Sequence, residues 1–477
     1  MAIIIGCDSF LSLRNVRNGD LGWRLAGERV LVLVDPNQFE GSLAACPAGV
    51  DLGRLLDFDP YADSQLGRLL LQSYCARKSY YDPGTFWVKL QAMSYKNNPR
   101  SFLRRTASLA KARYTLATHW IAGRWGLAQH RRQALVQALR AHETVAEYKK
   151  LLPEWQASVV VGFSLEGWRE MALLEAANEL GIPTAVMIRS RDNLAAKIQH
   201  LPDADAYFVW AEMTRKFLLH MYPEIPAERV YVTGSPQFDH HLDPTHRLPR
   251  QEFFQRVGLD PNRPLIVYTM ATPGLIDHEI EIVQYLADAA HAGRFFRQAH
   301  LLVRGHPRMF GSNLKLLHNS YREARRYPPP ARPAYKSPEH EANVVRLILE
   351  DEPMHLATLA YQDVQVNVCG TMTIDSAIFD KPTVNVCFDV VDGIPPGLSV
   401  QRFYRRSDVK QMIAYGASRL AYTPEECIRL INRYLEDPTL DAEGRKRARE
   451  QECGPLDGQA GLRIADSIVR LAERRNV

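Results

Sequence analysis

The stretch from Val364 to Phe388, VQVNVCGTMTIDSAIFDKPTVNVCF, decides the fold of this 477-residue chain. Apolar side chains alternate up to Cys369 and indicate a strand. A short helical pattern follows, and a Lys-Pro pair ends it before a second apolar strand. A strand, a helix and a strand in this order are typical of a parallel sheet. The stretch therefore predicts the α/β class.

The turn between the first strand and the helix is rich in small and hydroxyl-bearing residues. Gly370 lets a ligand approach the backbone, and Thr371, Thr373 and Ser376 place hydroxyls beside the free amides of a helix start, where an anion is favoured. Asp375 can accept hydrogen bonds from a sugar diol. The turn predicts a site for a phosphate-bearing nucleotide. The alternative is that the hydroxyls only cap the helix.

Length and composition set the broad class of the protein. A chain of 477 residues exceeds what one core usually supports, so we expect two domains. The hydrophobic share of 46% and the charged share of 24% are typical of a globular protein. A net charge of +5 is too small to indicate a nucleic-acid partner, and we expect none.

The cysteines and the N-terminus bear on the compartment and on metals. The seven cysteines are scattered and show no CxxC or Cys/His spacing, which predicts reduced thiols and no metal site. The apolar run after Met1 is too short for a signal peptide, and no stretch is long enough for a membrane-spanning helix. We expect a cytoplasmic protein.

Apolar runs that read as buried strands recur along the first half of the chain, and charged residues follow two of them. Asp8 lies just past the first run, where the carboxyl end of a parallel strand borders a ligand crevice, although it is equally typical of a turn. Asp192 lies in a charged loop after the strand at Thr184 to Ile188, and Glu166 begins the preceding helix. A polar stretch from His240 to Arg250 suits a linker between domains.

The segment at 83–142 contains no acidic residue. It carries many bases, with Phe, Tyr and Trp residues between them, and few Gly or Pro residues interrupt its helical pattern. Such helices suit an anionic membrane surface or an anionic acceptor. The alternative is a solvated helical insertion whose aromatic side chains pack inward.

The second half contains a compact cationic loop, Arg304-Gly305-His306-Pro307-Arg308, directly after a predicted strand. Imidazole and guanidinium groups at a strand end, with Gly for close approach, suit a phosphate. His278 lies at the start of an earlier helix in this half and is a further candidate for proton transfer.

Three pieces of the chain together resemble a known superfamily. They are VYVTGSPQFD at the end of the first half, RGHPR, and CGTMTIDSAIFDKP. Their order and spacing resemble the GT-B glycosyltransferases, near the branch that holds CDP-glycerol glycerophosphotransferase-like, capsule sialyl- and Kdo-transferase-like and UDP-N-acetylglucosamine 2-epimerase-like proteins. The resemblance covers roughly residues 158 to 390. It implies two Rossmann-like domains that face a cleft, with the basic helices inserted in the first.

The resemblance also implies domain limits and roles. Residues 1–245 would form the acceptor domain, with a helical insertion at about 83–150, residues 246–455 the nucleotide-donor domain, and 456–477 a C-terminal helix. His306 and Pro307 match the motif used at the donor phosphate, and the hydroxyl-rich turn matches a motif on the same phosphates. Asp375 stands where many members carry a ribose-binding Glu.

The implied reaction moves a sugar from a nucleotide sugar to a glycan or glycolipid of surface-polysaccharide assembly, without a metal or a further cofactor. The nucleotide stays open among CMP, CDP, UDP and GDP. A catalytic base is needed at the acceptor hydroxyl. Asp192, Asp8, Glu166 and His278 are the candidates, of which we favour Asp192. The alternatives are a nucleotide-sugar 2-epimerase, a CDP-polyol phosphotransferase, and a scaffold subunit without catalytic activity.

Overall fold

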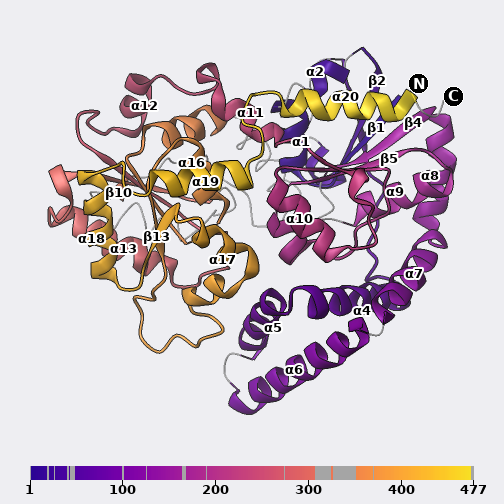
Figure 1. The fold of residues 1–477 in the computed structure, drawn as a ribbon, viewed down its shortest axis with the longest axis horizontal. Helices are drawn as coiled ribbons and strands as arrows, with labels where there is room; N and C mark the ends of the chain where they lie inside the picture. Colours follow the sequence, from indigo (N-terminus) through magenta and orange to yellow (C-terminus); the bar gives the residue numbers. More distant parts are fainter. Residues whose placement is uncertain are drawn as a thin grey trace. The chain divides into compact units, whose positions relative to one another are not determined.

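The computed structural model describes residues 2–18, 21–25, 27–39, 42, 49–98, 101–124, 126–163, 168–189, 191–272, 274–306, 324–325, 351–368 and 370–473. The chain divides into two compact units (Figure 1). Unit 1 comprises residues 1–90, 101–242 and 452–477, and unit 2 comprises residues 91–100 and 243–451.

Unit 1 is built on a seven-stranded sheet in which every pair of neighbouring strands is parallel, in the order β3-β2-β1-β4-β5-β6-β7. Its strands are β1 (Ala2–Cys7), β2 (Arg29–Val34), β3 (Asp51–Arg54), β4 (Ala157–Gly162), β5 (Thr184–Ile188), β6 (Ala206–Val209) and β7 (Val230–Val232). Successive strands are added on one side of β1 up to β3 and on its other side from β4 onward, so the strand order reverses between β1 and β4. Ligands of doubly wound sheets bind at such a switch point, outside the carboxyl ends of the strands.

The helices of unit 1 fall into two groups. The helices that flank the sheet are α1 (Phe10–Asn18), α2 (Leu21–Leu25), α8 (Glu143–Glu154), α9 (Arg169–Glu179), α10 (Glu212–Met221), α11 (Pro236–Leu242) and α20 (Ala460–Glu473). The basic segment forms α5 (Pro83–Asn97), α6 (Phe102–Arg124) and α7 (Leu127–Arg140), which follow α4 (Ser64–Tyr81). Residues 83–90 of α5 belong to unit 1, and its residues from 91 onward belong to unit 2. Short turns of other helix types are η1 (Pro36–Gln38), η2 (Asn193–Lys197) and η3 (Ala227–Arg229).

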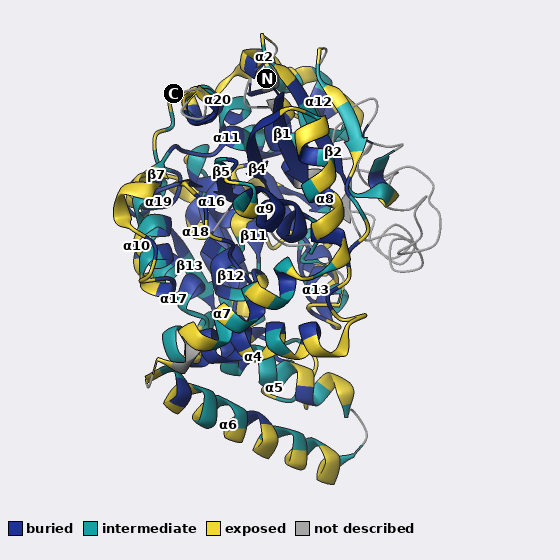
Figure 2. Cartoon of the chain, turned by 90° about the vertical axis from the view of Figure 1, so that its right-hand side faces the viewer, coloured by how far each residue is buried: buried dark blue, intermediate teal, exposed yellow. Residues whose placement is uncertain are grey.

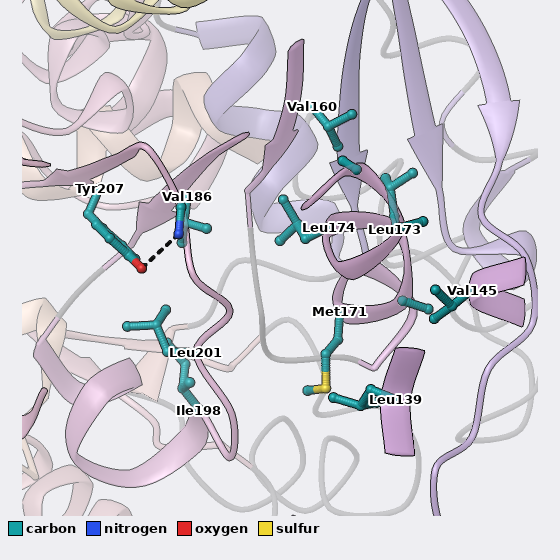
Figure 3. Close-up of a cluster of buried hydrophobic side chains, with 14 of the residues drawn as sticks. Leu139, Val145, Val160, Met171, Leu173, Leu174, Val186, Ile198, Leu201 and Tyr207 are labelled. Atoms are coloured by element: carbon teal, nitrogen blue, oxygen red, sulfur yellow. Dashed lines mark hydrogen bonds between the residues drawn. The ribbon is translucent and has the colours of Figure 1, made fainter. Parts of the chain in front are cut away.

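The core of unit 1 lies between its sheet and helices. Figure 3 shows part of it, where Val160 of β4 and Val186 of β5 lie near Leu173 and Leu174 of α9. All four side chains are fully buried. Burial of aliphatic side chains on this scale is the main favourable term in folding, about 1.5–3 kcal/mol for each.

Unit 2 repeats the plan with a six-stranded parallel sheet in the order β10-β9-β8-β11-β12-β13. Its strands are β8 (Leu265–Thr269), β9 (His300–Arg304), β10 (Ala324–Arg325), β11 (Val364–Asn367), β12 (Thr383–Val386) and β13 (Ser418–Ala421). Its helices include η4 (Pro244–His246), α12 (Arg250–Val257), α13 (Glu279–His291), η5 (Phe296–Gln298), a helix at 351–361, α16 (Thr371–Ile378), η6 (Val400–Arg405), α17 (Ser407–Ala414), α18 (Pro424–Glu436) and α19 (Ala442–Glu452).

The prediction of an α/β fold with two Rossmann-like domains is confirmed, since both sheets follow the 3-2-1-4-5-6 order of such domains. The division between units falls at residues 242 and 243, beside the predicted limit at 245. The C-terminal helix α20 belongs to unit 1, where it contacts α2 and β4. None of the described helices has the length and apolar character needed to span a bilayer.

Candidate functional site

Three loops of unit 2 leave its sheet at the same level. The register places Thr269 at the end of β8 between Arg304 of β9 and Asn367 of β11. The switch point of the sheet lies between β8 and β11. The two pieces of sequence predicted to bind phosphate therefore follow neighbouring positions at one edge of one sheet, where a ligand is expected.

The loop after β11 leads into α16, and few protein groups lie close to the start of this helix. Gly370 is the N-cap residue of α16, and no side chain caps the helix start. Thr371 is exposed at the first helical position. An added Cβ at Gly370 would meet only the carbonyl oxygen of Val368, at 3.8 Å. The start of α16 thus offers backbone amides and one outward hydroxyl to an anion.

The other two hydroxyls of the predicted motif face the protein interior. Asn385 donates to the Oδ1 atom of Asn367 at 2.6 Å and to the Oγ1 atom of Thr373 at 3.2 Å. Gln362 donates to the Oγ atom of Ser376 at 3.1 Å, and both hydroxyl residues are buried. Thr373 and Ser376 hold α16 to the sheet. Of the three predicted hydroxyls, Thr371 is the one placed to meet a ligand.

Asp375 is also largely buried, with 8% of its surface exposed. It lies four positions after Thr371, so the two residues lie on the same side of α16. Its assignment to a ribose stays a prediction.

The cationic loop is described only as far as His306, so Pro307 and Arg308 lie outside the described residues. Thr272, in the loop after β8, has its Oγ1 atom 3.3 Å from the Nε2 atom of His306. This contact joins the loops after β8 and β9. Arg304, in contrast, forms an ion pair with Asp351 through its guanidinium group. We therefore assign Arg304 to holding the loop, and His306 remains the candidate phosphate ligand.

A buried glutamate supports the loop after β8. Glu279 accepts hydrogen bonds from the backbone amide of Ala271 at 2.9 Å and from the hydroxyl of Tyr268 at 3.2 Å. Burial raises the pKa of the Glu279 carboxyl to about 7, although the two donors act in the opposite direction. No feature of the sequence indicates this role, because an acidic residue in the first turn is common in any helix.

His278 lies at the N-cap of α13 in unit 2. Its Nε2 atom is 2.6 Å from Oδ1 of Asp389, and that oxygen also accepts from the backbone amide of Val400 at 2.9 Å. Asp389 follows β12, so this pair connects the loops after β8 and β12. A carboxylate that fixes an imidazole in this way sets which ring nitrogen carries the proton.

Asp8 lies at the switch point of unit 1, at the end of β1. Its carboxylate accepts from the backbone amide of Arg169 at 3.2 Å and lies 3.4 Å from the Nη1 atom of the same residue. Burial raises the pKa of Asp8 to about 6 against the opposing charge of Arg169, and Asp35 raises it further. Asp57 also pairs with Arg169, at 2.8 Å. Asp8 is thus a buried carboxylate with a raised pKa, and its role as a base stays a prediction.

Asp192 has a different setting, after β5. It lies 2.9 Å from the Nζ atom of Lys197, and both side chains are partly exposed. The neighbouring Arg191 is buried and pairs with Glu452 at 2.9 Å, which ties this loop to the C-terminal segment of unit 1. The fourth candidate base, Glu166, lies outside the described residues.

Among the described residues, no three His, Cys, Asp or Glu side chains are grouped as metal ligands would be. The absence of a metal from the reaction stays a prediction.

Comparisons with solved structures identify the fold. Over 98% of its length the chain matches all of UDP-GlcNAc 2-epimerase from Neisseria meningitidis bound to UDP-GlcNAc, with a TM-score of 0.53 and 11% identity. It matches 97% of MnaA from S. aureus, solved with UDP, with the same score and identity over 98% of its own length. Over 99% of its length it also matches 98% of CalG4, the calicheamicin glycosyltransferase, with a TM-score of 0.50 and 11% identity.

The chain has the GT-B fold. Neither a protein-family model nor a curated protein matches it. The resemblance inferred from three short pieces of sequence is therefore confirmed at the level of the fold. Proteins of this fold include an epimerase of UDP-GlcNAc and a glycosyltransferase.

Proposed function

We propose that this GT-B protein is a glycosyltransferase that takes a sugar from a nucleotide-sugar donor bound at the switch point of unit 2. The observation that carries the proposal is the convergence of three loops at that point. Gly370 and Thr371 open α16 after β11, and the Thr272 to His306 contact joins the loops after the two neighbouring strands.

The chemistry requires neutralisation of charge on the leaving phosphate as the sugar bond breaks. Backbone amides at the start of α16 and the imidazole of His306 are suited to this, and we place Arg308 there as well. Fixed donors of this kind stabilise developing charge without a metal. Gly370 allows the phosphate to approach the backbone, and Asp375 would receive the ribose.

Unit 1 would supply the acceptor side. The base that removes the acceptor proton must be ionised near neutral pH and still have a high affinity for that proton, so a pKa just below neutral suits it. Asp8, with its pKa raised to about 6, meets this requirement. We place Asp8 rather than Asp192 in this role, because Asp192 forms a partly exposed ion pair with Lys197 at 2.9 Å.

We propose that the acceptor is a glycan or glycolipid of surface-polysaccharide assembly and that the enzyme acts at the cytoplasmic face of a membrane. The acceptor class rests on the resemblance to capsule-type enzymes. The membrane rests on the basic helices of unit 1, whose outward surface carries cations and apolar side chains.

Calorimetric titration with CMP, CDP, UDP and GDP tests the proposal. We expect one of the four to bind, and His306→Ala to weaken that binding. His291→Ala is the matched control, because His291 is an exposed histidine at the far end of α13. If none of the four nucleotides binds the wild-type protein, the proposal fails.

A nucleotide-sugar 2-epimerase is the second candidate, because two of the matched structures are of proteins linked to that activity or to UDP. Turnover of the donor in the absence of any acceptor would favour it. A strict requirement for a CDP-polyol would favour a phosphotransferase. Retention of cellular function by His306→Ala would favour a scaffold subunit.

A further inference from the structure

One side of helix α6 is exposed, as Figure 2 shows, and the sequence places an apolar stripe on that side. Six apolar residues recur at alternating spacings of four and three, and all six are exposed. We call them the α6 stripe: Leu103, Ala107, Ala110, Tyr114, Ala117 and Ile121. Leu103 is 80% exposed, Tyr114 71% and Ile121 52%. A seam with this period normally packs against another surface.

The opposite side of α6 already has its partner within unit 1. Ala112, two positions from Tyr114, is buried, and α6 packs along α4. A Cβ added at Gly123 would lie 2.6 Å from the Cβ of Tyr80 in α4, which shows how closely the two helices approach. The exposed stripe is therefore not the side by which α6 attaches to its own unit.

The charges beside the stripe all have one sign. Arg104 and Lys111 follow it on one flank, Arg113 lies on the other, and Arg124 lies near its end. Among the described residues no ion pair involves Arg104, Lys111 or Arg124, and Arg113 lies over the ring of Trp87 with its Cζ atom 5.4 Å from the centroid. With no acidic residue at 83–142, this surface is cationic along its whole length.

Aromatic residues border the same surface. Phe102 is 70% exposed and Trp120 40% exposed, beside Tyr114 within the stripe. Trp and Tyr place an apolar ring in the boundary between lipid chains and water and keep a polar atom in the wet region. A helix of 23 residues is about 34 Å long, so it can lie along a membrane surface over several lipids.

We propose that α6 is a membrane-docking helix that lies in the headgroup region of an anionic leaflet, with the α6 stripe toward the acyl chains. Charge repulsion makes a second copy of this chain a poorer partner for the α6 stripe than an anionic leaflet. Two α6 helices joined along their stripes would bring Arg104, Lys111 and Arg113 of each copy against cations of the other. An anionic leaflet removes that repulsion and covers the apolar side chains.

This inference deepens the proposed function, since it states which surface would bring the enzyme to a membrane-bound acceptor. Sedimentation of the full chain with vesicles tests it. We expect binding to phosphatidylcholine vesicles that contain phosphatidylglycerol, loss of binding as salt rises, and little binding to phosphatidylcholine alone. Equal binding to both vesicle types, or none to anionic vesicles at low salt, would overturn the proposal.

Two variants separate charge from apolar insertion. Arg104→Gln, Lys111→Gln and Arg124→Gln together should weaken binding by about fivefold per base, or on the order of a hundredfold. Leu103→Ser, Tyr114→Ser and Ile121→Ser together should abolish binding without unfolding the protein, because these side chains are exposed. Wild-type binding by either variant refutes the docking role of α6.

The matched control removes the same charge elsewhere. Lys410, Arg433 and Lys446 are exposed bases on three helices of unit 2. Changing all three to Gln should leave vesicle binding within about twofold of wild type. An equal loss in this control would mean that net charge, and not α6, controls binding. Nucleotide titration of all variants keeps this result separate from the donor site, since they should bind nucleotide as wild type does.

Discussion

Thr371 and Thr373 lie two positions apart in α16. We expect Thr371→Val to weaken nucleotide binding and Thr373→Val to lower stability. In Thr371→Val an exposed hydroxyl is lost, so stability should change by less than about 0.5 kcal/mol. A hydrogen bond to a charged phosphate contributes about 1.5–3 kcal/mol. The Kd of the nucleotide that binds should therefore rise about ten- to a hundredfold.

In Thr373→Val the loss falls on the fold. The Oγ1 atom of Thr373 accepts from Asn385 at 3.2 Å and lies 3.4 Å from Oδ1 of Asn367, with all three residues buried. Removing the hydroxyl leaves one N–H of the buried Asn385 amide without its acceptor, while the amide still donates to Asn367, and this loss costs about 1–3 kcal/mol. In a domain of roughly 200 residues each kcal/mol lowers the midpoint of thermal unfolding by about 2–4 °C.

Thermal unfolding and calorimetric titration of both variants test this contrast. For Thr371→Val we expect weak nucleotide binding with wild-type stability. For Thr373→Val we expect lower stability, with nearly normal nucleotide binding when the titration is done on the folded fraction of the protein. If Thr371→Val binds the nucleotide like wild type while Thr373→Val loses binding at unchanged stability, the orientation assigned to α16 is wrong.

Three further predictions concern ionisable groups. Burial raises the pKa of Glu279 from its ordinary 4.5 to about 7, so the folded state prefers the protonated carboxyl. The free energy of unfolding of the wild-type protein should therefore fall as pH rises from 4.5 to 7. Glu279→Gln should not show this fall, which amounts to at most about 3 kcal/mol; identical pH profiles would contradict the assignment. If Asp8 is the base, kcat/KM should decline below about pH 6, and Asp8→Asn should lower the rate at least about a hundredfold with donor binding intact. Asp389→Asn should lower kcat about tenfold or more through His278 and leave the Kd of the nucleotide unchanged, whereas a change in Kd alone would assign the pair to binding.

The sequence predicted most of the strands correctly because they are buried on both faces. Runs such as AIIIGC in β1 and SVVVG in β4 have no polar alternation, and the structure buries every residue of both strands. The strands that were missed are short and more polar. DLGR of β3 lies at a sheet edge with all four residues partly or fully exposed, and SRLA of β13 is an edge strand too.

The sequence predicts the hydroxyl-rich turn but does not distinguish the roles of its three hydroxyls. Helical geometry separates them, since Thr373 and Ser376 are three residues apart and share the buried face of α16. A signal for the amide network was also present. Val-Asn-Val occurs in both β11 and β12, and parallel pairing places Asn367 opposite Asn385. The pairing of the two strands was needed to see that these asparagines meet.

The contacts between other site residues had no signal in the sequence. The contact between His278 and Asp389 joins positions 111 residues apart, and the contact between Thr272 and His306 joins loops after two different strands. Such contacts follow from the order of strands in the sheet, which is a property of the whole domain. The raised pKa of Asp8 likewise depends on burial beneath the start of α9.

A crystal structure of the protein with its bound nucleotide tests the central claim most directly. We expect phosphate density in unit 2, within hydrogen-bond distance of the Thr371 hydroxyl and the His306 imidazole, outside the carboxyl ends of β8 and β11. Density for the nucleotide at the switch point of unit 1, beside Asp8, with the start of α16 empty, would contradict it.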